Sequence, residues 1–311
     1  MSYVQFGLIE ATDFNTFVGG INTTTANTLN ATWGLGAGNA GYGQTQVANV
    51  AAGQSVVATS FWNSLVSNVN SAASHQGSSI TVYSAPTAGG TISVLSAIPT
   101  NLQTIYSSRL NAATQGSTTA NTATFGSTWS AALTFTHTAT FANANAARHF
   151  FNAGGQLKMT VSHPSGTGIN LLFNNLASNV GTVVLSSPTS GSVSIAGGSY
   201  NGVTKVGGGG NTPTISTNSG FYALTTSNTT IFTQTASTGP SSYLGTFIRF
   251  IAAVNSATPN VVTIYTVWDE IPDGLTVSTG SATTMTAVAP ETTNLANSWG
   301  TITLAGSVTG S

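Results

Sequence analysis

The chain has 311 residues, of which only 4% are charged: five Lys and Arg against six Asp and Glu, with a net charge of −1. Globular proteins usually carry about 25% charged residues. Enzymes need ionisable groups to move protons or hold metals, so this scarcity predicts a protein that is not an enzyme and uses no cofactor. The near-zero net charge attracts neither nucleic acid nor an anionic membrane, and neither is expected as a partner.

Hydrophobic residues make up 40% of the chain, including 14 Phe, 8 Tyr and 5 Trp, which excludes general disorder. The lack of cysteine excludes disulfides and thiolate metal sites. Met1 is not followed by a basic stretch and an apolar core, so no signal peptide is expected. No apolar run approaches the roughly 18 residues of a membrane span. Because a near-neutral surface does little to keep copies apart, we expect a protein that works in an assembly.

Apolar residues spaced by three and four predict three helices in the first third of the chain, at 14–33, 59–75 and 99–113. Gly77 is expected to end the second helix, because glycine readily adopts the left-handed conformation of a helix C-terminus. Residues 80–94 are predicted to be extended and broken by proline and glycine.

Residues 114–128 are Ser, Thr, Ala, Asn and Gly with little periodicity, which predicts a linker or irregular loop. This segment is also the best domain boundary that the sequence offers. We therefore expect a mainly helical attachment and oligomerisation region at 1–125 and a β-sandwich domain at 126–311.

Beyond this boundary, apolar residues alternate with polar ones and turn signals separate the segments. The pattern predicts an α+β protein whose C-terminal domain is an antiparallel, jelly-roll-like β-sandwich. The more continuously apolar segments 247–252 and 261–268 are predicted to be central strands buried on both faces. Short helices are predicted at 143–151 and 169–176. The remaining strands are predicted near 129–135, 157–161, 193–195 and 302–304.

Gly36, Gly38 and Gly41 match the pattern G-x-G-x-x-G of dinucleotide-binding loops. Such a site needs a strand before the loop, a helix after it and an acid about 20 residues further on. Here a predicted helix precedes the loop and no acid follows nearby. In a chain with 35 glycines, a tight loop is the favoured interpretation.

Asp269, Glu270 and Asp273 are half of all the acids. Clustered carboxylates suit a hard cation such as calcium. The spacing is not that of an EF-hand, and a strand end leading into an acidic turn explains the same residues. Whether they hold a cation stays open, and we assign no metal, cofactor or catalytic residue.

The histidines lie at positions 75, 137, 149 and 163, without the close spacing of zinc motifs. Structural hydrogen bonding or solvent exposure is the default expectation for them. A Ser-His-Asp triad stays open because serine is abundant, but no G-x-S-x-G segment supports a hydrolase. The acids are also too few and too clustered for a polysaccharide depolymerase with paired carboxylates in a groove.

Tyr200, Tyr222 and Tyr243 lie near Gly-rich or Ser-rich segments. Exposed aromatic rings of this kind can stack on sugars, but core or subunit-contact roles are favoured. Asn-x-Ser/Thr sequons, for instance at Asn22, Asn30 and Asn228, follow from composition alone and are not taken as glycosylation sites.

Several segments resemble virion structural proteins of tailed bacteriophages, notably those of marine and freshwater cyanophages. In the longest segment an arginine (Arg148), an aromatic pair, Asn152 and two glycines lead into a strand. The likeness covers nearly the whole chain, and its segments are 42–45, 61–65, 74–77, 147–157, 221–224, 262–269 and 300–311. Arg148 is expected to hold the turn at 152–155 through hydrogen bonds to carbonyl groups.

The resemblance implies a structural component of the virion, assembled in the host cytoplasm, such as a tail fibre or a tail-, neck- or baseplate-attached protein. It carries no catalytic motif to transfer. The expected partners are copies of the chain in a trimer or symmetric ring, other tail, neck or baseplate proteins, and a host surface glycan. The alternative is a carbohydrate- or host-receptor-binding tip protein whose loop aromatics make the contact.

Overall fold

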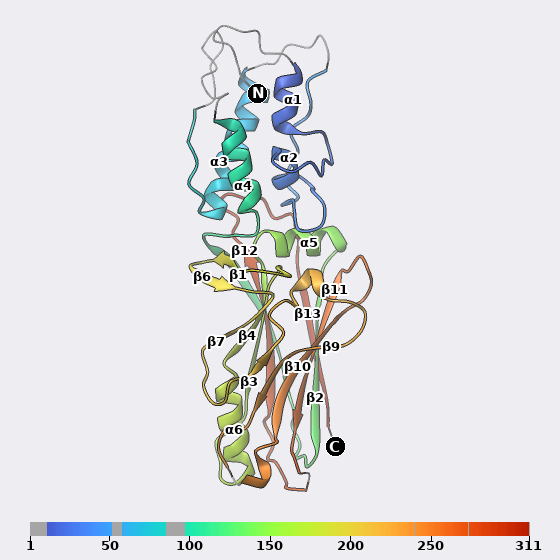
Figure 1. The fold of residues 1–311 in the computed structure, drawn as a ribbon. Helices are drawn as coiled ribbons and strands as arrows, with labels where there is room; N and C mark the ends of the chain where they lie inside the picture. The colour runs from blue at the N-terminus through green and yellow to red at the C-terminus, as the bar shows by residue number, and fades with distance from the viewer. Residues whose placement is uncertain (1–10, 52–57, 85–96, 240, 273, 311) are drawn as a thin grey trace.

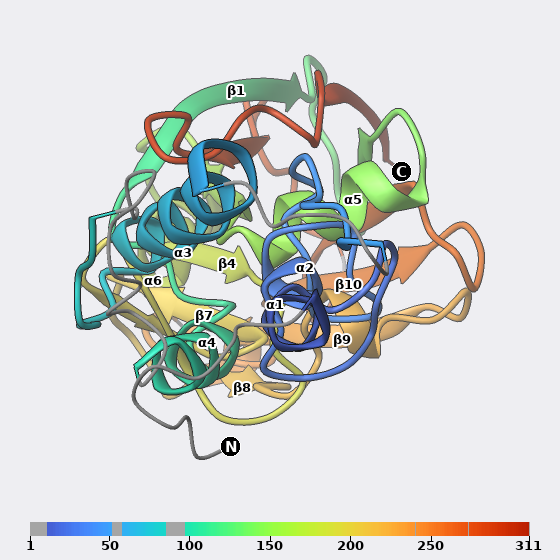
Figure 2. The same ribbon diagram turned by 90° about the horizontal axis from the view of Figure 1, so that it is seen from above.

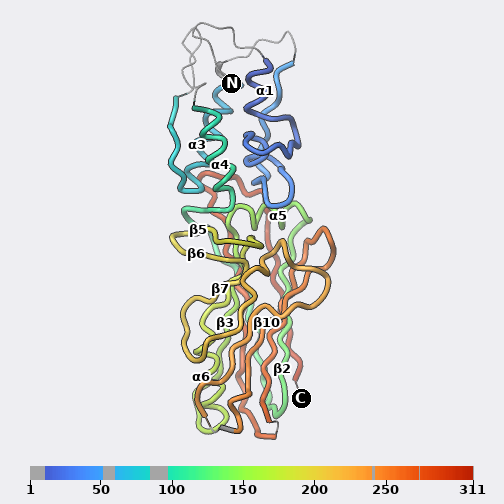
Figure 3. The backbone as a smooth tube through the Cα atoms, in the orientation of Figure 1, coloured from blue at the N-terminus to red at the C-terminus, as the bar shows by residue number. Residues whose placement is uncertain are grey.

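The computed structural model describes residues 11–51, 58–84, 97–239, 241–272 and 274–310. The molecule is elongated, with a group of helices at one end and two β-sheets along the rest of its length (Figure 1). The tube in Figure 3 follows the chain from the helical end at α1 to β13, which runs toward the opposite end. The predicted α+β class, with antiparallel sheets in the C-terminal part, is confirmed.

The helical end contains α1 (Ala11–Val18), α2 (Leu29–Thr32), a π-helical turn (Ala58–Trp62) that continues into α3 (Asn63–Gln76), and α4 (Ile98–Ser107). The prediction of one helix at 14–33 is wrong, because the chain leaves α1 at Gly19 and enters α2 only at Leu29. Gly19, Asn22 and Asn27 have φ values of 74°, 57° and 61°. This left-handed backbone cannot continue a right-handed helix.

The second predicted helix is confirmed. α3 buries one apolar stripe that includes Leu65, Val69 and Ala72. It ends at Gly77, whose φ of 68° closes the last turn. α4 stops earlier than predicted, at Ser107, and the chain then crosses to the sandwich, where Ala112 forms a bridge with Ile195. Of the predicted extended segment, residues 85–94 lie outside the described residues, and 80–84 form no regular strand.

Two antiparallel sheets form the sandwich. The first has the order β1 (Gln115–Thr124), β12 (Ala282–Pro290), β3 (Gln156–Ser162), β4 (Thr182–Leu185) and β7 (Val203–Val206). The second has the order β13 (Thr303–Gly310), β2 (Ala132–Thr140), β11 (Val261–Asp269), β10 (Phe247–Val254), β9 (Thr229–Thr235) and β8 (Thr214–Ile215). A small hairpin joins β5 (Val193–Ile195) to β6 (Gly198–Tyr200). The jelly-roll connectivity stays a prediction.

The prediction of an irregular loop at 114–128 is wrong, because β1 occupies most of it and pairs with β12 along its length. β1 has no apolar alternation because it is an edge strand, in which only Ala123 is buried. Its Ser and Thr side chains face solvent, so the usual signal of a strand is missing. The division into domains at residue 125 stays a prediction, and the first strand of the sandwich precedes it.

The core of the sandwich lies between the two sheets. Trp268 of β11 packs beside Phe135 of β2, at 6.1 Å between ring centroids, and beside His163 across the sandwich, at 6.4 Å. β11 is an inner strand, as predicted, but it is not buried on both faces. Its residues alternate between buried and half-buried from Val261 to Asp269, which fits a sheet with one solvated face.

Both predicted inserted helices are confirmed as α5 (Ala144–Asn152) and α6 (Ile169–Val180). α5 lies where the helices meet the sandwich, and α6 lies near the far end (Figure 1). Seen along the long axis, α1 to α4 cover the end of the sandwich while β1 runs along the rim (Figure 2). None of the helices within the described residues has the length and apolar character that a bilayer crossing requires.

The cap of α5 gives a test of this part of the fold. The Asn143 side chain accepts a hydrogen bond from the backbone N–H of Ala146 at 2.9 Å. Replacing Asn143 with Ala should lower the free energy of unfolding by about 1 kcal/mol, measured by urea denaturation. Asn143→Ser keeps a capping oxygen and should retain most of the stability, whereas equal losses in both variants would contradict the assignment.

Candidate functional site

The loop at residues 36–44 lies between the helices and the sandwich and forms the centre of a buried polar junction. The chain turns through left-handed conformations at Gly36, Gly38, Gly41 and Gly43, with φ values of 53°, 54°, 92° and 69°. A side chain at Gly36 would overlap the backbone of Ala40. The tight-loop interpretation of the G-x-G-x-x-G match therefore agrees with the structure.

Arg148 of α5 holds this loop from the side of the sandwich. Its guanidinium donates to the carbonyl oxygens of Gly38, Leu35 and Ala40, each at 3.1 Å. The expected contact with the turn at 152–155 is wrong, since Arg148 is directed toward the glycine loop. One cation thus satisfies three carbonyl groups at the surface between the two parts of the molecule.

Asn152 and Tyr222 complete the contact with the glycine loop. The Asn152 side-chain amide donates to the carbonyl oxygens of Ala40 and Gly41, both at 3.1 Å. The Tyr222 hydroxyl lies 2.7 Å from the carbonyl oxygen of Gly38 and 2.6 Å from the side-chain oxygen of Asn152. Burial raises the pKa of Tyr222. Its hydroxyl is therefore bonded within the chain, which agrees with the favoured structural role and not with stacking on sugars.

A second group of contacts ties the loop to α3 and α4. Gln76 donates from its side-chain nitrogen to the Tyr42 hydroxyl at 2.7 Å and to the carbonyl oxygen of Ile105 at 2.9 Å. Tyr42 in turn donates to the carbonyl oxygen of Arg109 at 2.9 Å. Tyr42 is fully buried, and this burial raises its pKa.

A third group joins the loop to the segment between β12 and β13. Gln44 donates to the carbonyl oxygen of Ala296 at 2.9 Å and accepts from its backbone N–H at 2.8 Å. The two residues lie 252 positions apart in the chain. On the same side, His75 at the end of α3 contacts the Glu291 carboxylate at 2.9 Å, with both side chains buried.

Glu291 is the anion of the junction. Burial by itself would raise its pKa, but hydrogen bonds from His75 and from the backbone N–H groups of Asn294 and Thr293 outweigh that effect. The pKa falls from an ordinary 4.5 to about 2. The carboxylate therefore stays ionised at neutral pH and orders the turn that leads to Ala296.

The four histidines are buried and lie in separate places. His149 packs against Gly43, and burial followed by the charge of Arg148 lowers its pKa to about 4. His163 contacts Ser281 at 3.0 Å and Asn170 at 3.2 Å within the sandwich. Burial also lowers the pKa of His137 and His163. Within the described residues, no three His, Asp or Glu side chains are arranged to hold a metal ion.

The acidic segment at the end of β11 is described only in part. Glu270 is buried and accepts a hydrogen bond from the backbone N–H of Leu275 at 3.1 Å. Asp269 is the last residue of β11, and Asp273 lies outside the described residues. A calcium site at these residues stays a hypothesis.

Two of the remaining predicted positions have packing roles. Tyr200 and Tyr243 are half-buried and pack against apolar clusters. Asn30, the acceptor asparagine of a sequon, is fully buried and bonded in both directions to the backbone of Val47 at 2.8 and 3.0 Å. Its burial agrees with treating that sequon as a product of composition.

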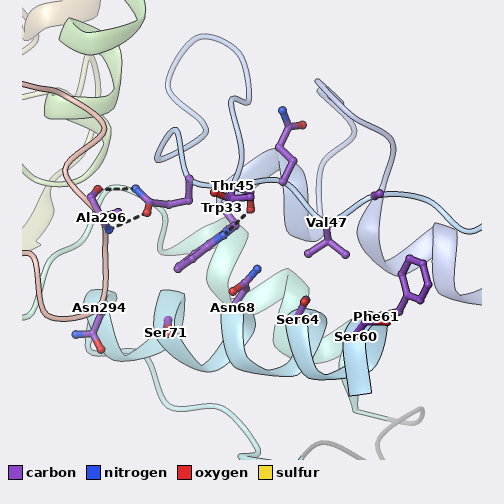
Figure 4. Close-up of a pocket in the computed structure, with 13 residues that line it drawn as sticks. Trp33, Thr45, Val47, Ser60, Phe61, Ser64, Asn68, Ser71, Asn294 and Ala296 are labelled. Atoms are coloured by element: carbon purple, nitrogen blue, oxygen red, sulfur yellow. Dashed lines mark hydrogen bonds between the residues drawn. The ribbon is translucent and has the colours of Figure 1, made fainter. Parts of the chain in front are cut away.

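A groove beside the junction is the candidate binding site. It has a volume of about 600 Å³ and runs between α3 and the extended segment that follows the glycine loop. Figure 4 shows Ser64, Asn68 and Ser71 on one face of α3, opposite Thr45 and the ring of Trp33. The side chains of Asn68 and Ser71 form no hydrogen bond with any described residue. None of the described residues that line the groove is charged, so it suits an uncharged polar ligand.

A second hollow of about 610 Å³ lies on the side of the junction formed by Arg148, Tyr222 and Pro259. Among the described residues that line it, Arg148 carries a charge, and its guanidinium is already bonded to the loop and to Asn145. This hollow therefore offers mainly apolar and backbone surface to a ligand.

The described charged residues are half-buried or buried. Nine are described, and none falls in the exposed class: Asp13, Arg109, Arg148, Lys158, Lys205, Arg249, Asp269, Glu270 and Glu291. Lys205 donates to Gln234 and Gly209, both at 3.0 Å, and Arg249 stacks on Phe247 at 4.2 Å. Uncharged polar and apolar side chains make up most of the described exterior. Sequence reasoning found the scarcity of charge, but it could not find where the charges lie.

Tyr222 gives a test of the junction. Replacing it with Phe removes the hydroxyl that bridges Gly38 and Asn152 and should cost about 1 to 2 kcal/mol of unfolding free energy in denaturant titrations. Tyr200→Phe is the matched control, because no hydroxyl bond of Tyr200 is present among the described residues, and it should stay within about 0.5 kcal/mol. Equal effects in the two variants would contradict the bridging role.

The Glu291 contacts predict a dependence of stability on pH. Because the pKa is lower in the folded chain, the stabilising contribution is present above pH 4.5 and is lost as the pH falls toward about 2. Glu291→Gln should therefore lower the melting temperature at pH 7. It should also reduce the fall in melting temperature as the pH drops below 4.5, measured by thermal unfolding at a series of pH values. An unchanged acid slope in this variant would show that Glu291 does not contribute.

The comparisons with known proteins supply no relative. No family model, curated protein or solved structure matches the chain. The proposal for its function therefore depends on its own residues and their arrangement.

Proposed function

We propose that this protein is a non-enzymatic structural component of a phage virion, such as a tail fibre or a tail-, neck- or baseplate-attached protein. It acts through oligomeric assembly and surface contact. The observation that carries the proposal is an exterior with very little charge, because every described charged residue is at least partly buried. The resemblance of seven segments to virion proteins of tailed phages and the elongated two-part shape support the same function (Figure 1).

An uncharged exterior lowers the cost of contact between proteins. Burying a charge requires strong compensation, whereas Ser, Thr and Asn side chains need only hydrogen bonds. The net charge of −1 adds almost no long-range repulsion between copies. These properties favour a homo-oligomer, with a trimer or a symmetric ring as the expected forms, and many copies gain strength through avidity.

The two ends of the molecule suit different contacts. The helical end is proposed to attach to other tail, neck or baseplate proteins, and the sandwich to face outward. The few charged groups have structural tasks: Arg148 binds backbone carbonyl oxygens, and Glu291 binds backbone N–H groups. Because Arg148 and Glu291 are bonded to the backbone, few ionisable side chains among the described residues are left for proton transfer. We therefore propose no reaction.

The location in the virion can be tested directly. Purified particles of the phage that encodes the chain should contain it in multiple copies by quantitative mass spectrometry, and antibodies against it should label the tail, neck or baseplate in electron micrographs. Its absence from particles that are otherwise complete would overturn the proposal.

A carbohydrate- or host-receptor-binding tip is the second candidate, and the groove in Figure 4 favours it. Side-chain amides and hydroxyls beside an aromatic ring suit the hydroxyl groups and apolar face of a neutral sugar. Glycan-array binding that is lost in Asn68→Ala but kept in Ser67→Ala, a change at an exposed residue outside the groove, would support this function. Absence of any glycan or host-cell binding would count against it.

A further inference from the structure

The sandwich has one side on which two long strands leave their outer edges unpaired. β1 contributes ten residues and β13 contributes eight. Each is the last strand of its sheet, and within the described residues neither outer edge pairs with another strand. Most side chains of both strands are exposed. Figure 2 shows β1 along the rim of the molecule, with nothing outside it.

Soluble proteins usually protect such edges, because a row of free N–H and C=O groups invites pairing with another chain. Common protections are Lys residues, prolines, bulges and very short strands. β1 and β13 contain neither a charged residue nor a proline. The one irregularity of β1 lies at its start, between Gln115 and Thr118, and leaves the rest of the edge regular.

The opposite side of the sandwich is protected. β7 has four residues and includes Lys205, and β8 has two residues. Long, uncharged edge strands are therefore found on only one of the two described sides of the sandwich. We name the side formed by β1 and β13 the β1/β13 side. A partner that matches these edges must offer long strand edges of its own without charges.

The geometry of the β1/β13 side makes a second copy of this chain a suitable partner. Gly306 of β13 lies against the side chain of Asn121, and Gly310 lies against that of Phe125. The two strands therefore run in the same direction, and Ala120 lies level with Ala305. β1 of one copy can pair with β13 of the next in parallel, and rotation about an axis along the strands repeats the contact.

We propose that the β1/β13 side is the interface between copies of this chain, in which β1 of one copy pairs in parallel with β13 of its neighbour. The inference rests on the proposed assembly and names the surface through which it forms. The arrangement is cyclic, so the helical ends of all copies lie together, as attachment to one structure in the virion requires. Backbone hydrogen bonds supply the contact, and the uncharged side chains on both edges avoid a cost for burying charge.

The absence of cysteine makes the register directly testable. A rotation along the strand axis does not shift residues along it, so Ala120 of one copy should face Ala305 of the next. Two single variants, Ala120→Cys and Ala305→Cys, are prepared separately, mixed, and oxidised with oxidised glutathione. The mixture should form about tenfold more disulfide-linked dimer than either variant alone, because a disulfide requires closely placed Cβ atoms.

Two outcomes of this experiment would overturn the inference. Linking of Ala120→Cys to itself would show that β1 pairs with β1 about a two-fold axis. If the chains in the mixture assemble but form no disulfide, copies associate through a surface other than the β1/β13 side. Neither outcome would contradict the proposed function, because the chain could still be found in virions. That function is tested separately, by the search for the chain in purified particles.

Charged substitutions give a second, independent test. The double variant Thr119→Lys/Ser307→Lys places a charge on each exposed edge and should reduce the mass measured by light scattering to that of one chain. The matched control, Thr229→Lys/Thr230→Lys, adds the same charge at exposed residues of β9, away from the β1/β13 side, and should remain assembled. Circular dichroism checks that both variants are folded, and an assembled edge variant would contradict the inference.

Discussion

The placement of charge is the constraint on which the rest of this structure depends. The chain has eleven acidic and basic residues, and all nine in the described part are at least partly withdrawn from solvent. Several of them are concentrated where the helices meet the sandwich. There, Arg148 binds three carbonyl groups. Glu291 binds His75 and the turn that follows Glu291 in the chain. Hydrogen bonds made by these charged groups therefore help to hold the two parts of one molecule together, and the described exterior carries little charge.

The junction shows how such a chain can fix its own shape without many ion pairs. Glycines give the loop at 36–44 a path that brings its carbonyl groups to Arg148 and Asn152. Side-chain amides replace salt bridges, as where Gln44 pairs with the backbone of Ala296. Burying a hydrogen-bonded amide carries a smaller desolvation penalty than burying a charge. The same lower desolvation penalty applies to contacts between copies, which links the fold to the proposed assembly.

The sequence predicted the elements whose burial follows a regular period. α3 and α6 each bury a single stripe, and β2 and β11 alternate, so the pattern was visible in the printed residues. β1 escaped prediction because an edge strand with one buried residue leaves no period to detect. The break between α1 and α2 was missed because apolar residues at helical spacing lie on both sides of it, although Gly19 and Asn22 adopt left-handed conformations. The contacts of the junction could not be predicted from the sequence. Gln44 and Ala296, for example, are 252 positions apart, and nothing in the neighbouring residues indicates that they touch.

If the uncharged exterior is what allows copies to associate, the strength of association should not depend on salt. Sedimentation equilibrium of the purified chain tests this between about 0.1 M and 1 M sodium chloride, where the screening length falls from about 10 Å to about 3 Å. The account predicts an oligomer whose dissociation constant changes by less than about twofold over this range. A chain that stays monomeric at high concentration, or an association that weakens about tenfold or more with added salt, would contradict it.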